Sequence, residues 1–401
     1  MKEIDLKEVY SIINSKLDEN EIIEFHRNFV KTPSVNPHFS PPGEEEAAQF
    51  LAKKMKEFGL KVEVDEVLPK RPNVYGKLEG KKTQPTLIFN SHMDVMPVGD
   101  VENWKMEPFG GDIIKGRIYG RGACDAKGPL SAMIMAAKVL NDIGVELTGN
   151  LLITAVVDEE VAQKGTLHIA DRGIRGNFGI VGEPTSLDMG IAHKGNAYYE
   201  VTVTGESAHA SVPEKGVNAI YKMAKIIDQI EKYHFELRTR KHKLLGSPSA
   251  NIGTITGGDA TNAVPPKCTI TVDRRYIPGE SGETAKKELE HIIGILKKND
   301  PELKAKIKKT IDAEALETSE EEPIVKALKE AGKTVVDQSI RTLGFPYASD
   351  AWILSNKLNV PTVLFGPGHI DMAHKPNEFV EINELINATR IYALTAFKLL
   401  N

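Results

Sequence analysis

The 401-residue sequence contains little cysteine and no long apolar run. Two cysteines, Cys124 and Cys268, provide no disulfide framework, so we expect a reducing compartment. No apolar stretch approaches the roughly 20 residues that cross a bilayer. The charged N-terminal segment also lacks the apolar core of a signal peptide. These absences predict a cytoplasmic protein without a membrane partner.

A surplus of positive charge is also missing, because the formal net charge is −5. Without a basic field the chain has nothing to hold a nucleic-acid backbone, and we predict no nucleic-acid partner. Hydrophobic residues make up 41% of the sequence, which is enough at this length for a large core and more than one domain. Helical spacing of apolar residues predicts helices within residues 1–30.

Histidines and acids follow several apolar runs that are predicted to be strands, at residues 87–89, 151–157, 178–181 and 360–365. Strands that alternate with helices predict an α/β fold with a mostly parallel central sheet. Such sheets place their ligand sites beyond the carboxyl ends of the strands. A metal site at that edge is therefore favoured over a scatter of surface acids. The side chains that follow the runs are His92, Asp94, Glu159, Glu160, Glu183 and His374.

Asp125 adds a further carboxylate, in a loop just before a helix predicted over residues 129–143. Among the candidate ligands it is the only acid between the two halves of the set, and a helix N-terminus favours an anion, so Asp125 is the predicted bridge. Two histidines and three carboxylates suffice for two zinc ions that share one carboxylate, and cobalt or manganese would also fit. A bridging water would be the nucleophile, and one of Glu159 and Glu160 would take its proton.

The order of predicted elements changes between about residues 193 and 314, where it reads β-α-β-β-α-β. This order is the signature of a ferredoxin-like unit. We therefore predict a discontinuous catalytic domain of residues 1–192 and 315–401, with residues 193–314 inserted as a second domain.

Seven segments of the chain resemble one known family, that of the co-catalytic zinc aminoacylases and carboxypeptidases. This family includes acetylornithine deacetylase, succinyl-diaminopimelate desuccinylase and carboxypeptidase G. The resemblance runs through nearly the whole chain and implies a zinc-exopeptidase-like catalytic domain with an inserted lid or dimerisation domain. The matching segments are residues 91–95, 104–109, 120–128, 158–160, 182–185, 208–211 and 373–378.

The resemblance also implies which residues would hold two divalent metal ions. His92 and Glu183 would bind one ion, Glu160 and His374 the other, and Asp125 would bridge them. Zinc is the expected metal.

Further roles follow from the same resemblance. Glu159 would be the general base and acid, and Asp94 would orient His92. The inserted domain would form a homodimer, and its His209 would donate to the oxyanion in cis or in trans. Asn262 would contact the substrate, and Arg275 would bind its carboxylate.

The expected function is hydrolysis of the amide bond of an N-acyl amino acid with a free carboxylate, with the acyl group left open. One alternative is a metallo-carboxypeptidase or dipeptidase of the same family, acting on short peptides. Glu183 favours the deacylase and carboxypeptidase G side, because the dipeptidase branches tend to carry Asp there. A second alternative is a binding protein without chemistry, but the complete ligand set and Glu159 argue against it.

Overall fold

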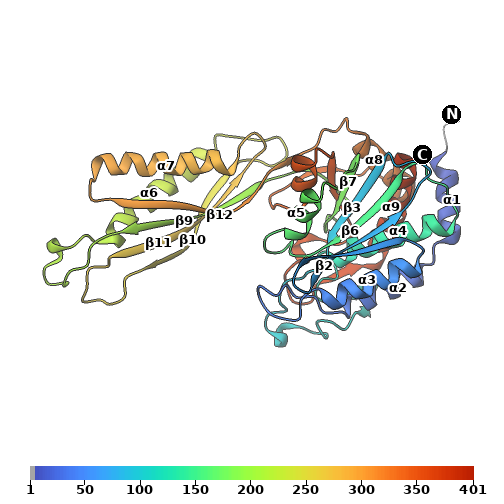
Figure 1. The fold of residues 1–401 in the computed structure, drawn as a ribbon, viewed down its shortest axis with the longest axis horizontal. Coiled ribbons are helices and arrows are strands. Elements are labelled where there is room, and N and C mark those ends of the chain that lie inside the picture. Colours follow the sequence, from blue (N-terminus) through green and yellow to red (C-terminus); the bar gives the residue numbers. More distant parts are fainter. Residues whose placement is uncertain (1–4) are drawn as a thin grey trace. The chain divides into compact units, whose positions relative to one another are not determined.

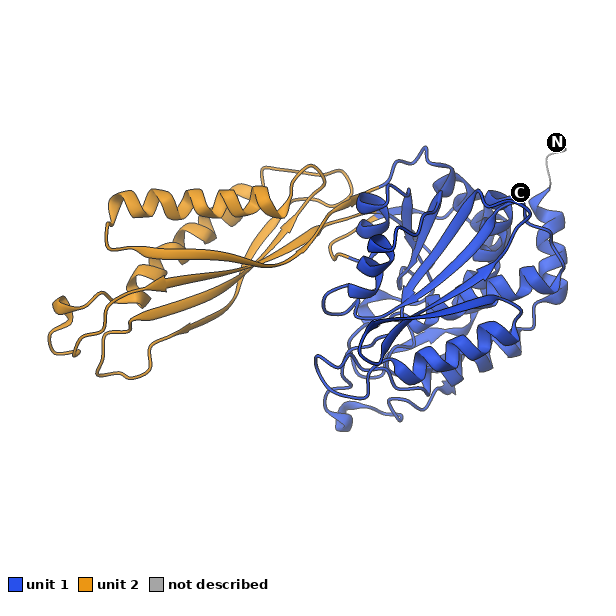
Figure 2. Ribbon diagram, viewed as in Figure 1, with its two compact units in different colours: residues 1–191, 318–343, 349–401 blue, residues 192–317, 344–348 orange. Residues whose placement is uncertain are grey.

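The computed structural model describes residues 5–401, and the chain divides into two units (Figure 2). Unit 1 comprises residues 1–191, 318–343 and 349–401, and unit 2 comprises residues 192–317 and 344–348. Unit 2 thus includes a short segment, 344–348, that the sequence pattern did not indicate.

The N-terminal helices begin where aspartates cap them. Asp5 accepts a hydrogen bond from the amide of Lys7, and Asp18 accepts from the amides of Asn20 and Glu21. The helical prediction also covered residues 1–4, which lie outside the described residues. The first three helices are α1 (Leu6–Lys16), α2 (Glu19–Val30) and α3 (Glu45–Glu57).

The largest sheet among the described residues has nine strands, with the order β1-β2-β6-β3-β7-β15-β8-β13 and with β14 paired to β8. Its strands are β1 (Lys61–Leu68), β2 (Arg71–Leu78), β3 (Thr86–His92), β6 (Asn150–Val156), β7 (Phe178–Gly182), β8 (Met189–His193), β13 (Leu316–Glu317), β14 (Thr342–Phe345) and β15 (Thr362–Phe365).

The sheet is mixed, so the prediction of a mostly parallel sheet holds only for its central strands β6-β3-β7-β15. On one side, β1 and β2 form a hairpin joined by only two residues, which requires antiparallel pairing. On the other side, β8 runs antiparallel to both β15 and β13.

Helices cover both faces of the central strands (Figure 1). Phe89 of β3 packs on Tyr392 of α9 (Ile382–Leu400), with ring centroids 5.1 Å apart. The next residue, Asn90, points to the other face and donates to the hydroxyl of Thr166 in α5 (Lys164–Asp171) over 3.0 Å. Helices α4 (Lys127–Asp142) and α8 (Pro323–Val336) pack against α9, and a small sheet consists of β4 (Asp112–Ile114), β5 (Arg117–Tyr119) and β16 (Phe379–Glu381).

Unit 2 contains a four-stranded antiparallel sheet with the order β10-β11-β9-β12 and two helices on one of its faces (Figure 1). Along β9, Tyr199, Val201 and Val203 are buried against these helices, as expected for a sheet covered on one side. The elements are β9 (Gly195–Thr204), α6 (Ala219–Leu237), β10 (Ser249–Gly257), β11 (Lys267–Tyr276), α7 (Gly282–Asn299) and β12 (Lys304–Ala313).

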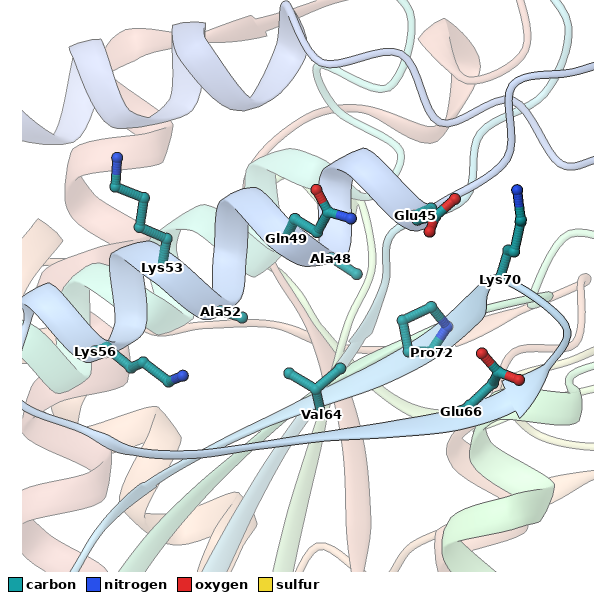
Figure 3. A pocket seen from close by; sticks show the side chains of 10 residues that line it. All are labelled: Glu45, Ala48, Gln49, Ala52, Lys53, Lys56, Val64, Glu66, Lys70 and Pro72. Atoms are coloured by element: carbon teal, nitrogen blue, oxygen red, sulfur yellow. The ribbon is translucent and has the colours of Figure 1, made fainter.

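A surface hollow of about 560 Å3 lies between α3 and the β1–β2 hairpin (Figure 3). Its residues come from one helix and one hairpin at the edge of the sheet, and they include no histidine. The hollow is therefore not the predicted metal site. Its lining residues are Glu45, Ala48, Gln49, Ala52, Lys53, Lys56, Val64, Glu66, Lys70 and Pro72. Among residues 5–401, no helix is long and apolar enough to cross a membrane.

Candidate metal centre

Four neighbouring parallel strands carry predicted ligands at or beyond their carboxyl ends. His92 is the last residue of β3, and Glu183 directly follows β7. Glu160 lies in the turn after β6, and His374 lies in the loop after β15. Because β6, β3, β7 and β15 are adjacent and parallel, these side chains are delivered to one edge of the sheet.

Asp125 joins these residues into two triads that share its carboxylate. One triad is His92, Asp125 and Glu183, and the other is Asp125, Glu160 and His374, with ligand atoms within 4.8 Å of one another in each. Oδ1 of Asp125 lies 3.2 Å from Nε2 of His92, and Oδ2 lies 3.1 Å from Nε2 of His374. The two oxygens of Asp125 therefore face different triads.

The ring of His92 is oriented by a main-chain atom. Its Nδ1 donates to the carbonyl oxygen of Asp94 over 2.8 Å, whereas the carboxylate of Asp94 is 3.9 Å away. In the neutral imidazole this contact leaves a lone pair on Nε2, which faces the Asp125 carboxylate. Two facing acceptors need a proton or a cation between them, so the arrangement fits a metal ligand.

The charges of the site also fit bound cations. Burial raises the pKa of Glu183 well above its ordinary value, and repulsion from Asp125 acts in the same direction. Burial and repulsion from Asp125 raise the pKa of Glu160 to about 7. Among the described residues, Oε1 of Glu160 is buried without a hydrogen-bond partner. Closely spaced acids with an unpaired oxygen are the setting in which a divalent ion is favourable.

The carboxylate of Asp94 holds the turn that carries Glu159 and Glu160. Its Oδ1 accepts a hydrogen bond from the amide of Glu159 over 3.1 Å, and its Oδ2 accepts from the amide of Glu160 over 3.2 Å. The preceding residue, Asp158, has a φ of +67°, a left-handed conformation that few side chains adopt without support. Asp94 thus contacts both triads, through its carbonyl oxygen at His92 and through its carboxylate at the turn.

A buried ion pair fixes the loops of Asp125 and His374. The Glu378 carboxylate accepts from the amides of Gly122, Cys124 and Asp125 over 3.0–3.1 Å. Nη1 of Arg121 donates to Glu378 over 2.6 Å, and Nη2 donates to the carbonyl oxygen of His374 over 3.2 Å. The loops that carry these two ligands are therefore fixed to each other.

Replacing Arg121 with Met is expected to lower the free energy of unfolding by about 3–5 kcal/mol, because it leaves a buried carboxylate without its cation. Arg117→Met is a matched control, since Arg117 pairs with Glu381 nearby and both side chains are about 40% exposed. The control substitution is expected to lower the free energy of unfolding by less than about 1 kcal/mol. Denaturant unfolding of the two variants measures the difference, and equal losses would contradict the assigned role of the Arg121–Glu378 pair.

Asp350 is a further acid at the site that sequence reasoning missed. It is buried, its Oδ2 accepts from the hydroxyl of Thr166 over 2.6 Å, and burial raises its pKa to about 7. Its charge also helps to raise the pKa values of Glu159 and Glu183. No apolar run ends at Asp350, so the signal that found the other acids does not mark it.

Three further residues predicted for the site belong to unit 2 and are not members of the triads. They are His209, Asn262 and Arg275. His209 is exposed, and its neighbour Ala210 donates through its amide to the carbonyl oxygen of Asn262 over 3.0 Å, so these two loops lie side by side. Arg275 on β11 is partly exposed and is held by Asp273, with Nε 2.9 Å from Oδ1. The neighbouring Arg274 is fully buried, so of these two arginines Arg275 is the one accessible to a ligand.

His369, whose role the sequence left open, caps a short helix. Its Nδ1 accepts from the amide of Asp371 over 3.1 Å, at the start of the turn Ile370–Met372. His369 therefore shapes the loop that leads to His374.

Comparison with known proteins finds matches that extend over most of the chain. The profile of "Peptidase family M20/M25/M40" matches residues 88–398. Acetylornithine deacetylase of Proteus mirabilis is 31% identical, over 90% of this chain and 92% of its own length. The N-formyl-4-amino-5-aminomethyl-2-methylpyrimidine deformylase of Bacillus subtilis is 28% identical, over 96% of each chain.

Among solved structures, an M20 family metallo-carboxypeptidase from Sulfolobus solfataricus superposes with a TM-score of 0.78 at 23% identity, covering 95% of this chain and 99% of its own. Likeness at that identity shows a shared fold, here a mixed α/β fold. The profile match and the relative above 30% identity go further, and they establish that this chain belongs to peptidase family M20/M25/M40.

Proposed function

We propose that this M20 family hydrolase is a binuclear metal-dependent deacylase, which cleaves the amide bond of an N-acyl amino acid with a free carboxylate. One observation carries the proposal. Two ligand triads share Asp125 at the carboxyl edge of the parallel strands, and Glu159 lies in the same turn as the ligand Glu160.

In this proposal the two triads hold two divalent ions, zinc by preference and cobalt or manganese as alternatives. Bound ions of this kind lower the pKa of water towards neutrality and polarise a carbonyl group. His92, with Nδ1 fixed by the carbonyl of Asp94, would offer Nε2 as a ligand in a single tautomer.

Glu159 is proposed as the general base and acid. It belongs to neither triad, yet its amide is held by the Asp94 carboxylate. Burial raises the pKa of its side chain well above the ordinary value, and the charge of Glu183 contributes in the same direction. As a carboxylate beside the proposed ions, it would accept a proton from water and return it to the leaving amine.

Unit 2 is proposed to be a ferredoxin-like lid that also forms a homodimer. Its element order β9-α6-β10-β11-α7-β12 and its strand order support this proposal. Within it, His209 would donate to the oxyanion, Asn262 would contact the substrate and Arg275 would bind the carboxylate. The accessible guanidinium of Arg275, held in place by Asp273, suits a planar anion.

The proposal is tested by assaying metal-loaded protein on N-acetyl and N-succinyl amino acids beside dipeptides and short peptides. We expect turnover of at least one acyl amino acid, with a kcat/KM above that for any dipeptide. Membership of a peptidase family makes the cleavage of peptides the second candidate. Faster cleavage of the peptides would select it, and no turnover of either class would contradict both.

Replacing Arg275 with Met is expected to lower kcat/KM for a free N-acyl amino acid by roughly 10–100-fold, because a charged hydrogen-bonded pair is lost. The methyl ester of the same substrate is the control, since its neutral group cannot form the pair, and its kcat/KM should change less than about threefold. Equal losses on acid and ester would show that Arg275 does not bind the carboxylate.

A further inference from the structure

An N-terminal segment, before the family match begins at residue 88, reaches the metal centre. Residues 34–36 run beside residues 93–95, directly after β3. The amide of Val95 donates to the carbonyl oxygen of Ser34 over 3.0 Å, and the amide of Asn36 donates to that of Val95 over 3.0 Å. This pairing fixes the backbone of Asn36 beside Asp94.

The side chain of Asn36 is fully buried between two carboxylates. Its Nδ2 donates to Oδ2 of Asp94 over 2.8 Å and to Oδ1 of Asp158 over 3.2 Å. Its Oδ1 accepts from the amide of His38 over 3.0 Å, which fixes the orientation of the carboxamide. Two buried carboxylates that lie close together repel each other unless hydrogen-bond donors stabilise their charges. Nδ2 of Asn36 donates one hydrogen bond to each of them.

A cation supports the second of these carboxylates. Nη2 of Arg71 lies 2.9 Å from Oδ1 of Asp158, the same oxygen that Asn36 contacts. The guanidinium is in turn held by two bonds to Glu44, 2.6 and 2.7 Å long, and Glu44 is fully buried. Contacts therefore run from Glu44 through Arg71 to Asp158, at the start of the turn.

Both contacted carboxylates control the same short turn. Asp94 holds the amides of Glu159 and Glu160, while Asp158 begins the turn in a left-handed conformation. We propose that Asn36, supported by Arg71 and Glu44, is a positioning residue that fixes this turn. Through the turn it holds Glu160 for metal binding and, on the proposed function, Glu159 for proton transfer.

The test compares Asn36→Ala, Asn36→Ser and Asn36→Leu for cobalt(II) affinity, followed by the visible absorption of the bound ion in competition with a chelator. We expect Asn36→Ala to weaken cobalt binding by about 10–100-fold, the usual effect of removing a group that supports a ligand. Its kcat on the best N-acyl substrate should fall by a similar factor, with KM within about twofold. Asn36→Ser retains one donor and should lie between Asn36→Ala and the unchanged protein.

Asn36→Leu separates positioning from packing. It preserves the approximate size of the side chain but supplies no donor to Asp94 or Asp158. We expect it to weaken cobalt binding about as much as Asn36→Ala. If Asn36→Leu binds cobalt like the unchanged protein, the side chain only fills space, and the inference is overturned.

Asn150→Ala is the matched control. Asn150 is 4% exposed and begins β6, at the opposite end of the strand from the turn. Its side chain makes two hydrogen bonds, one to the carbonyl oxygen of Thr83 and one from the amide of Gly80. Asn150→Ala should lower the free energy of unfolding without lowering the affinity for cobalt. An equal loss of cobalt affinity in Asn150→Ala and Asn36→Ala would overturn the inference.

The cobalt measurement also separates this inference from the proposed function. If the Asn36 variants weaken cobalt binding but the unchanged protein hydrolyses no acyl amino acid, the positioning role stands and the deacylase assignment fails. If all Asn36 variants bind cobalt like the unchanged protein, the positioning role fails whatever the activity.

Discussion

Replacing Glu159 with Gln is expected to lower kcat by about 10²–10⁴-fold on the best substrate, the usual contribution of a general base. Gln has nearly the same shape but cannot take a proton at neutral pH. Because Glu159 belongs to neither triad, both metal ions should stay bound, and KM should change little. Steady-state kinetics at saturating metal, together with elemental analysis of the purified variant, measure both expectations.

Glu63→Gln serves as the control for this change. Glu63 is an exposed residue of β1 that pairs with Arg172, and its substitution should leave kcat unaltered. Unchanged turnover in the Glu159 variant would show that another group is the base. A loss of one metal equivalent would instead identify Glu159 as a ligand.

Removal of the metal ions is expected to make the protein less stable as the pH rises from about 5 to 7. Burial raises the pKa of Asp350 from 3.8 to about 7, and burial with repulsion from Asp125 raises that of Glu160 to about 7. A raised pKa in the folded state favours the protonated form. The contribution of these two groups to the free energy of unfolding is therefore fully present below their ordinary pKa values. It is lost as the pH rises through 7, where both groups ionise in the folded protein.

The expected loss of unfolding free energy in the metal-free protein is large enough to measure. A pKa change from 3.8 to about 7 for the buried Asp350 corresponds to roughly 4 kcal/mol at full deprotonation. The contacts with Asp125 and Glu160 raise the pKa of His374 to about 10, so its contribution is lost only at higher pH. Asp125 has a lowered pKa, because His374 and His92 stabilise its charge against burial, and its stabilisation is lost only at more acidic pH.

Metal-loaded protein should show the opposite trend over the same range. Ions bind deprotonated ligands, so their stabilisation grows with pH, and it reaches about 4 kcal/mol at a thousandfold excess over the dissociation constant. Urea unfolding of chelator-treated and zinc-loaded protein at pH 5, 6 and 7 measures both slopes. Asp350→Asn should flatten the metal-free slope, and a metal-free protein that gains stability between pH 5 and 7 would contradict the prediction.

Local patterns in the sequence located many elements of the fold. The apolar runs at 87–89 and 178–181 lie within β3 and β7, and the run at 151–157 lies within one residue of β6 at each end. The mixed character of the central sheet could not be predicted, because strand order depends on contacts between distant segments. A short strand such as β8 shows no apolar periodicity that would reveal its direction.

The candidate site was predictable where ligands follow apolar strands, as His92 and Glu183 do. Spacing alone left Glu159 and Glu160 interchangeable, and the family resemblance supplied the choice. The sequence also cannot tell that His92 is held by the carbonyl of Asp94 and not by its carboxylate. Asn36 and Arg71 lie outside any such pattern, in a proline-rich loop and at a hairpin, and only the folded chain brings them to the turn.

The shared carboxylate of Asp125 has a thermodynamic consequence. Whatever fills one triad orders and polarises the side chain that the other triad needs, so the two occupancies are linked. Linkage is reciprocal: if the first ion changes the affinity for the second by some factor, the second changes the affinity for the first by the same factor. A metal titration of this protein should therefore deviate from two independent, superimposed binding curves.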